Sequence, residues 1–90
     1  MDSKKVISLY SQLKASATNN IEVIGYLIDI EAALHKLKPR HQFILEKICI
    51  EGYTQAEVAA MLGITKSTLN GVYHNALIQF ERHLHYDKQY

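Results

Sequence analysis

Residues 54–77 read TQAEVAAMLGITKSTLNGVYHNAL, and this stretch decides the fold of the chain. Thr54 and Glu57 have the spacing of a capping box, in which each side chain satisfies an otherwise unpaired backbone N–H at a helix start. Gly63 follows the apolar part of this helix, and a glycine just past the last turn is typical of a helix end. Thr65 is then placed to cap a longer helix. The stretch therefore predicts a short helix, a tight glycine turn and a long helix.

The two predicted helices must cross steeply, because the turn between them is short. Such a crossing requires a small residue at the contact, and Ala59 stands four positions before Gly63. The long helix carries a continuous apolar seam toward the same core. This spacing predicts a helix-turn-helix unit, which DNA-binding proteins use to read base edges. The seam and the shared core consist of Val58, Leu62, Ile64, Leu69, Val72, Tyr73, Ala76, Leu77, Phe80 and Leu84.

With the seam inward, the first turns of the long helix present a polar face. Asn bonds adenine in a bidentate way, Lys reaches guanine or phosphate, and Ser and Thr are permissive partners. Thr54 is expected to meet phosphate with its hydroxyl and with free backbone N–H groups at the start of the supporting helix. The predicted DNA-contacting residues are Lys66, Ser67, Thr68, Asn70, Gly71, His74, Asn75, Thr54 and Arg40.

Three more helices are predicted upstream, because apolar residues recur there with helical spacing. They span about Ser3 to Ala17, Asn20 to Leu37 and Pro39 to Glu51. Proline suits a first helical turn, where its missing N–H is not needed, and Gly52 ends the third helix. We therefore expect an all-α fold, a bundle of about five helices with a C-terminal helix-turn-helix.

The second of these helices is apolar around most of its circumference and needs cover on two sides. One side packs on the rest of the domain, and the other is sealed either by the first helix or by a second copy of the protein. Residues 1–36 are assigned to packing or dimerisation and residues 37–90 to the helix-turn-helix part of one compact domain. The apolar positions are Ile21, Val23, Ile24, Tyr26, Leu27, Ile28, Ile30 and Leu34.

Composition narrows the class of protein. Apolar residues make up 48% of the chain, as in a folded domain, and no apolar run reaches the length of about 20 residues that a membrane span needs. The N-terminus lacks the pattern of a secretory signal, so a soluble cytoplasmic protein is expected. The formal net charge is only +1, whereas proteins that neutralise phosphates usually have a clear basic excess. A DNA-binding role therefore rests on the motif.

Neither catalysis nor a metal or other cofactor is expected. Asp29 and Glu31 are too close in sequence to frame a catalytic pair without a pocket. His83 and His85 point in different directions on a helix, and no cysteine or carboxylate completes a metal site with them. Cys49 is the single cysteine and is expected to be a small buried hydrophobe.

A basic cluster, Lys36, Lys38, Arg40 and His41, surrounds the start of the third helix. These side chains either contact phosphate or cap the C-terminus of the second helix, where the helix dipole favours positive charge. The residues themselves leave both roles open.

Several short motifs recur in one known family: Leu37 with Arg40, Gly52-Tyr53-Thr54, Glu57-Val58-Ala59, Leu62-Gly63-Ile64-Thr65 and Ala76-Leu77. In these motifs the stretch 37–84 resembles the fourth-region domain of bacterial sigma factors, which reads the −35 promoter element and contacts the flap of RNA polymerase. The resemblance implies double-stranded DNA as a partner, with RNA polymerase or another transcription protein as a further one. It also implies a small phage or prophage regulator.

The chain departs from this family at basic positions, where Asn70, Asn75, Ile78 and Gln79 stand, and Gly71 interrupts the recognition helix at a cost of about 1 kcal/mol relative to alanine. Two functions follow. The first is a sequence-specific DNA-binding transcription regulator that forms a homodimer through its N-terminal helices. The alternative is a protein-binding adaptor, decoy or inhibitor that presents the same scaffold to RNA polymerase or another regulator.

Overall fold

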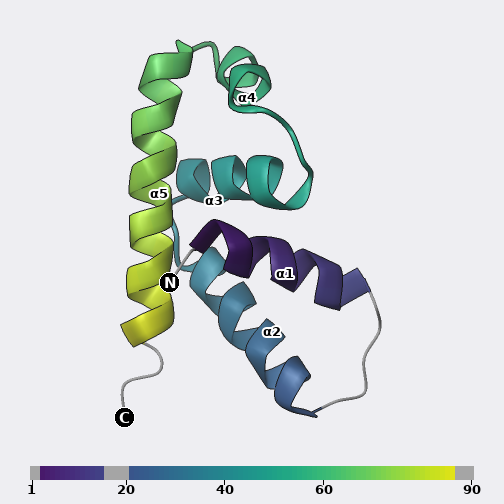
Figure 1. The fold of residues 1–90 in the computed structure, drawn as a ribbon. Coiled ribbons are helices and arrows are strands. Elements are labelled where there is room, and N and C mark those ends of the chain that lie inside the picture. The colour runs from purple at the N-terminus through teal and green to yellow at the C-terminus, as the bar shows by residue number, and fades with distance from the viewer. Residues whose placement is uncertain (1–2, 16–20, 87–90) are drawn as a thin grey trace.

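The computed structural model describes residues 3–15 and 21–86 of the chain, and Figure 1 shows their arrangement. The expected all-α fold is confirmed, and no strand occurs in these two ranges. The predicted helix ends at Ala17 and Asn20 lie outside the described residues. The elements are α1 (Ser3–Ala15), α2 (Ile21–His35), α3 (Pro39–Leu45), the π-helical turn η1 (Glu46–Ile50), α4 (Gln55–Leu62) and α5 (Lys66–Tyr86).

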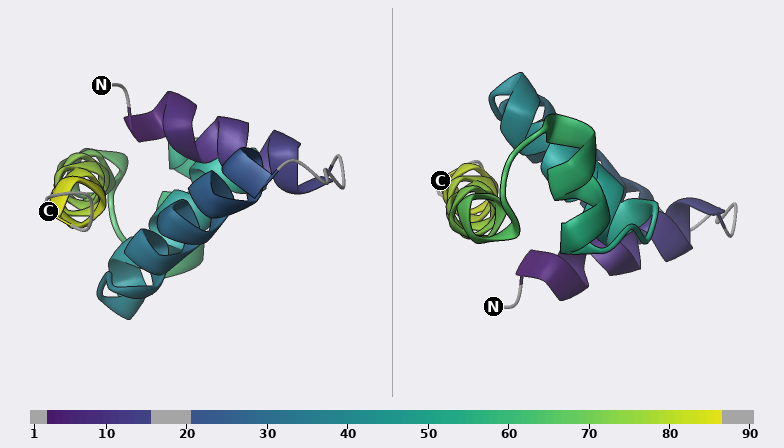
Figure 2. Two further views of the ribbon diagram at one scale, coloured as in Figure 1. Left: turned by 90° about the horizontal axis from the view of Figure 1, so that it is seen from below. Right: turned by 90° about the horizontal axis from the view of Figure 1, so that it is seen from above.

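The long helix α5 forms one side of the molecule. In Figure 1, α4 lies beside its N-terminal end, α3 meets it near its middle, and α1 and α2 lie toward its C-terminal half. Both views of Figure 2 show α5 nearly end-on, with the other helices gathered on one side of it. One face of α5 is therefore left uncovered by the other helices.

Every element contributes to one hydrophobic core. From α5, Leu69 and Phe80 are fully buried, as predicted for its seam. Burial of side chains this large stabilises a fold by about 1.5–3 kcal/mol each relative to exposure. The other elements supply Ile7 and Tyr10 (α1), Ile30, Ala33 and Leu34 (α2), Ile44 and Leu45 (α3), Cys49 (η1), and Val58 and Ala59 (α4).

The third predicted helix, Pro39 to Glu51, is not a regular α-helix throughout. Its second half widens into η1, where the Glu51 N–H donates to the Glu46 carbonyl at 2.9 Å, five residues back. The carbonyl groups in the last turn of a helix have no hydrogen-bond partner inside that helix. Here the Ser8 hydroxyl of α1 donates a hydrogen bond to the Cys49 carbonyl at 3.3 Å. This contact joins α1 to the end of η1. Periodicity of side chains does not report such a change of hydrogen-bond register.

The helix α2 ends at His35, two residues before the predicted end at Leu37. The Leu37 N–H bonds the Leu34 carbonyl at 3.2 Å, which is a tighter turn than an α-helix makes. Leu37 is nevertheless buried. The tighter turn redirects the chain so that α3 begins at Pro39.

The outer face of α2 is not sealed by α1. Although α1 packs against α2, Ile21, Ile24 and Ile28 remain 84%, 39% and 61% exposed. They lie on the side of α2 opposite the buried Ile30, because residues at spacings of three, four and seven share one helix face. The side chain of Val23 lies outside the described residues. The sequence predicted that either the first helix or a second copy of the protein seals this face of α2. The first helix does not seal it.

Two glycines have opposite local environments. Gly63 ends α4 at a φ of 67°, in the left-handed region that side chains disfavour. The N–H groups of Gly63 and Ile64 bond the carbonyls of Ala60 and Ala59 at 3.2 and 3.0 Å, which is the Schellman pattern of a helix end. Gly71 lies inside α5 with a helical backbone, and an added Cβ there would meet no atom within 4 Å.

We predict that Gly63→Ala lowers the free energy of unfolding by about 1–2 kcal/mol, because alanine must adopt the left-handed conformation. Gly71→Ala is expected to raise it by about 0.5–1 kcal/mol, because alanine favours the helix and meets no neighbour. Urea unfolding followed by circular dichroism measures both. A change of the same sign in the two variants would contradict this account of the turn.

Candidate nucleic-acid interface

The start of α4 is held by the predicted capping box. The Glu57 N–H donates to Thr54 Oγ1 at 3.1 Å, and the Thr54 N–H donates to Glu57 Oε1 at 3.0 Å. Both halves of the box are thus formed, and the helix begins at Gln55 as expected. The Glu57 carboxylate accepts the backbone N–H of Thr54, as the predicted box requires, so this N–H is not available to a phosphate.

The start of α5 is capped by Thr65, also as predicted. Its Oγ1 accepts the Thr68 N–H at 3.1 Å, and its hydroxyl donates to Thr68 Oγ1 at 2.9 Å. The Thr68 hydroxyl is therefore oriented by the cap and keeps its own hydrogen for another acceptor. The cap fixes the direction in which the first turn of α5 leaves the glycine turn.

Close packing behind the turn sets the angle between α4 and α5. Ala59 is 3% exposed, and Val58 and Leu69 are fully buried. Alanine lets the two helices approach, while the larger side chains fill the space beside it. The predicted small residue at the crossing is thus confirmed.

All predicted contact residues are exposed to solvent, but they do not form one group. Helical spacing puts Ser67 and Gly71 along the middle of the uncovered face of α5, opposite the buried seam. Lys66, Asn70 and His74 lie toward one edge of this face, and Thr68 and Asn75 toward the other. Arg40 is on α3, and Thr54 precedes α4. The seven residues of α5, Lys66, Ser67, Thr68, Asn70, Gly71, His74 and Asn75, are called the reading face below.

Beside the reading face lies a hollow of about 260 Å³ between the α2–α3 turn and the second half of α5. Sequence reasoning did not join these two segments, because they lie about forty positions apart and no local spacing relates them. It named the basic cluster and Asn75 separately, and it gave Gln79 and His83 no role in a site together. The hollow is lined by Lys36, Leu37, Lys38, His41, Asn75, Gln79 and His83.

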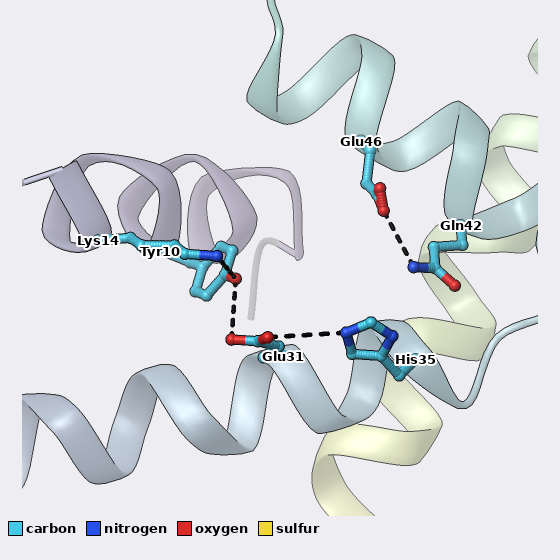
Figure 3. A network of polar contacts seen from close by, with 6 residues as sticks. All are labelled: Tyr10, Lys14, Glu31, His35, Gln42 and Glu46. Atoms are coloured by element: carbon cyan, nitrogen blue, oxygen red, sulfur yellow. Dashed lines mark hydrogen bonds and ion pairs between the residues drawn. The ribbon is translucent and has the colours of Figure 1, made fainter.

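A larger hollow of about 510 Å³ lies between α1, α2 and the α3–η1 segment, and Figure 3 shows its polar contacts. The Tyr10 hydroxyl donates to Glu31 at 3.3 Å, and Lys14 Nζ donates to the Tyr10 oxygen at 3.2 Å. The hydrogen bond to Tyr10, together with the negative charge of Glu31, raises the pKa of Lys14 above its usual value. His35 lies 3.7 Å from the other Glu31 oxygen. This network ties α1 to α2.

Three carboxylates, those of Glu31, Glu46 and Glu51, line the larger hollow, against one lysine. A surface of this charge repels phosphate. The larger hollow is therefore poorly suited to a phosphate group.

Two further findings concern the described part of the chain only. No helix within it is long and apolar enough to cross a membrane. Nor does it bring together three or more His, Cys, Asp or Glu side chains that could hold a metal ion.

A short capped helix, a left-handed glycine turn and a second capped helix with a polar uncovered face define the helix-turn-helix class of DNA-binding domains. Comparison with known protein families matches residues 33–79, slightly more than half of the chain, to sigma-70 region 4. The chain belongs to this family. Region 4 binds DNA, contacts RNA polymerase and is not a catalytic domain. Comparisons with curated proteins and with solved structures found no match.

The capping box predicts a pH dependence of stability. The hydrogen bond from the Thr54 N–H, and to a lesser degree a hydrogen bond with the Thr54 side chain, hold the pKa of the Glu57 carboxyl below its usual value of 4.5. A carboxyl whose pKa is lower in the folded than in the unfolded state stabilises the fold above its unfolded pKa and loses this effect as the pH falls through the folded one. We therefore expect Glu57→Gln to be less stable than wild type at neutral pH, and the difference to shrink below pH 4.5.

Urea unfolding of both proteins across this pH range provides the test, and NMR titration of the Glu57 carboxyl reports its pKa directly. A stability difference that stays constant from neutral to acid pH would show that the ionised carboxylate does not stabilise the cap.

Proposed function

We propose that the protein is a sequence-specific DNA-binding transcription regulator that inserts the reading face of α5 into the major groove. The exposure of this face supports the proposal, together with membership of a DNA-binding family. Lys66 and Asn70 are the side chains best suited to base edges, since lysine reaches guanine and asparagine pairs with adenine. Ser67 and His74 extend the contact along the groove.

The observation that carries this proposal is the environment of Gly71. The fold does not require glycine there, because an added Cβ would meet nothing within 4 Å and the backbone is helical. A glycine in mid-helix nevertheless costs about 0.5–1 kcal/mol relative to alanine. A surface that approaches the α5 backbone closely from outside supplies a reason for it, and a DNA groove is such a surface. Gly71 lies in the middle of the reading face.

Phosphate contacts fix the orientation of such a domain without reading sequence. We assign this role to the exposed Thr54 side chain, to Arg40 on α3 and to Asn75 on the edge of the reading face. These residues lie on three different segments: the start of α4, α3 and α5 itself.

We further propose that the regulator is a homodimer in which a second copy covers the outer face of α2. Ile21, Ile24 and Ile28 are exposed on that face, and oligomerisation is a common means of covering such surface on a small domain. A two-fold dimer presents two reading helices, so its DNA site is expected to be palindromic. We place it in the cytoplasm with the DNA it reads, as a phage or prophage regulator.

A second candidate function is a protein-binding adaptor, decoy or inhibitor that acts on RNA polymerase or another regulator. The exposed side chains of Ile78 on α5 and Met61 on α4, 39% and 47% accessible, favour it. Apolar side chains at these positions gain nothing from DNA phosphates but add contact area with a protein.

Selection of genomic fragments tests the first function. Wild-type protein is expected to enrich a shared motif, and Lys66→Ala/Asn70→Ala to lose it, since each good base contact contributes about 1–3 kcal/mol of discrimination. Gly71→Ala is expected to bind the same motif more weakly despite being more stable. Sequencing at two salt concentrations separates base reading from phosphate attraction.

Failure of the wild-type protein to enrich any sequence at low salt would reject this function and favour the adaptor. Unaltered enrichment by the double variant would reject the assignment of Lys66 and Asn70 to base reading.

The mass of the protein in solution tests the dimer. Light scattering is expected to give a dimer for wild type and a monomer for Ile28→Glu, because the introduced charge would be buried in the interface. Ile78→Glu places the same substitution on an exposed isoleucine of α5 and is expected to leave the dimer intact. Monomeric wild-type protein at micromolar concentration, or equal dissociation of both variants, would contradict the interface.

A further inference from the structure

The hollow beside the reading face has a one-sided charge. Two lysines line it, Lys36 and Lys38, together with the imidazoles of His41 and His83. None of the described residues that line it is a carboxylate. The formal net charge of +1 for the whole chain therefore does not report the local excess of basic side chains among these described residues.

The size and lining of the hollow suit a small anion rather than an organic ligand. Its volume of about 260 Å³ lies below the range of about 300–1,000 Å³ that is usual for small-molecule pockets. Its remaining polar groups, the amides of Asn75 and Gln79, supply N–H donors for an acceptor-rich group. A single phosphate group presents acceptor oxygens to all of these donors.

The position of the hollow follows the reading face along α5. Asn75, Gln79 and His83 are each four residues apart, so they share one edge of the helix. Asn75 belongs to the reading face and also lines the hollow. It lies about 6 Å along the helix axis from Gly71, at a rise of about 1.5 Å per residue. A DNA strand beside the inserted helix would pass this edge.

Backbone groups pair two of the carbonyls at the end of α2. The Ala32 and Leu34 carbonyls near its C-terminus accept the backbone N–H groups of Lys36 and Leu37, both at 3.2 Å. These two acceptors are satisfied without a lysine side chain. A place near the end of α2, where the helix dipole favours positive charge, leaves the lysine side chains able to contact a phosphate as well.

We propose that the hollow between the α2–α3 turn and α5 binds one phosphate group of the DNA backbone next to the bases that α5 reads. Lys36 and Lys38 supply the charge, and Asn75, Gln79 and the two histidines surround the phosphate oxygens. The DNA source of the phosphate rests on the proposed function. The lysines of the α2–α3 turn thus supply positive charge beside the edge of α5 where Asn75 and Gln79 stand.

A pair of matched double variants tests the site. Lys36→Gln/Lys38→Gln removes two charges at the hollow, and Lys4→Gln/Lys5→Gln removes two exposed charges on α1. Affinity is measured by fluorescence anisotropy over a range of salt concentrations, for a duplex with the selected motif and for an unrelated duplex. The hollow variant is expected to weaken binding to both duplexes by a similar factor, and to reduce the slope of log affinity against log salt by about 1, the value for one phosphate. The α1 variant is expected to leave the slope unchanged.

Equal slopes for wild type and the hollow variant would overturn the DNA contact while leaving the reading face in place. A loss confined to the selected motif would also overturn it, because it would mean base reading by the lysines. A slope reduced equally in both variants would show general attraction and no site.

A second measurement keeps the site testable if wild type binds no duplex at all. Inorganic phosphate is titrated into the protein, and backbone amide shifts are followed by NMR. Shifts at Lys38, Asn75 and Gln79 that disappear in Lys36→Gln/Lys38→Gln would retain the hollow as a phosphate site while the DNA-reading function fails. No shift at these residues, together with no DNA binding, would reject both.

Discussion

The left-handed turn at Gly63 is the constraint on which the rest of the domain depends. Its backbone φ of 67° and the hydrogen bonds back to Ala59 and Ala60 end α4 and redirect the chain within very few residues. Thr65 then caps α5 immediately, so the two helices leave the turn at a set angle. Because Ala59 lets them approach, the seam of α5 reaches the core and its opposite face remains in solvent. Exposure of the reading face is thus a consequence of local backbone geometry.

The charged side chains of this small protein are unevenly distributed, and the net charge of the chain does not show this. Three carboxylates line the hollow between α1, α2 and η1, and one of them, Glu31, accepts the Tyr10 hydroxyl and joins α2 to α1. Lysines and histidines line the hollow beside the reading face, and none of the described residues that line it is a carboxylate. At physiological ionic strength, charges act over about 8 Å. A phosphate beside the reading face is therefore influenced far more by the lysines and histidines of the smaller hollow than by the carboxylates of the larger one. A near-neutral chain is therefore compatible with a nucleic-acid surface of definite location.

The helix α2 shows how a packed domain leaves surface for association. Its inner residues, including Ile30, fill the core, yet three isoleucines on its outer face remain exposed. The α1 helix cannot cover both sides, because Tyr10 and Ser8 hold it against Glu31 of α2 and the Cys49 carbonyl of η1. Polar contacts on the inner side thereby determine which apolar surface remains available to a partner.

The sequence by itself determined the local structure: the capping box at Thr54, the glycine turn at Gly63, the cap at Thr65 and the buried seam of α5. Each depends on residues within a few positions of one another, so spacing alone reports it, and the family match over residues 33–79 agrees with the same motifs. Tertiary structure alone decided the π-helical register of η1, the uncovered outer face of α2, and the hollow that joins the α2–α3 turn to α5. These depend on contacts between distant segments, whose packing angles no local pattern of side chains encodes.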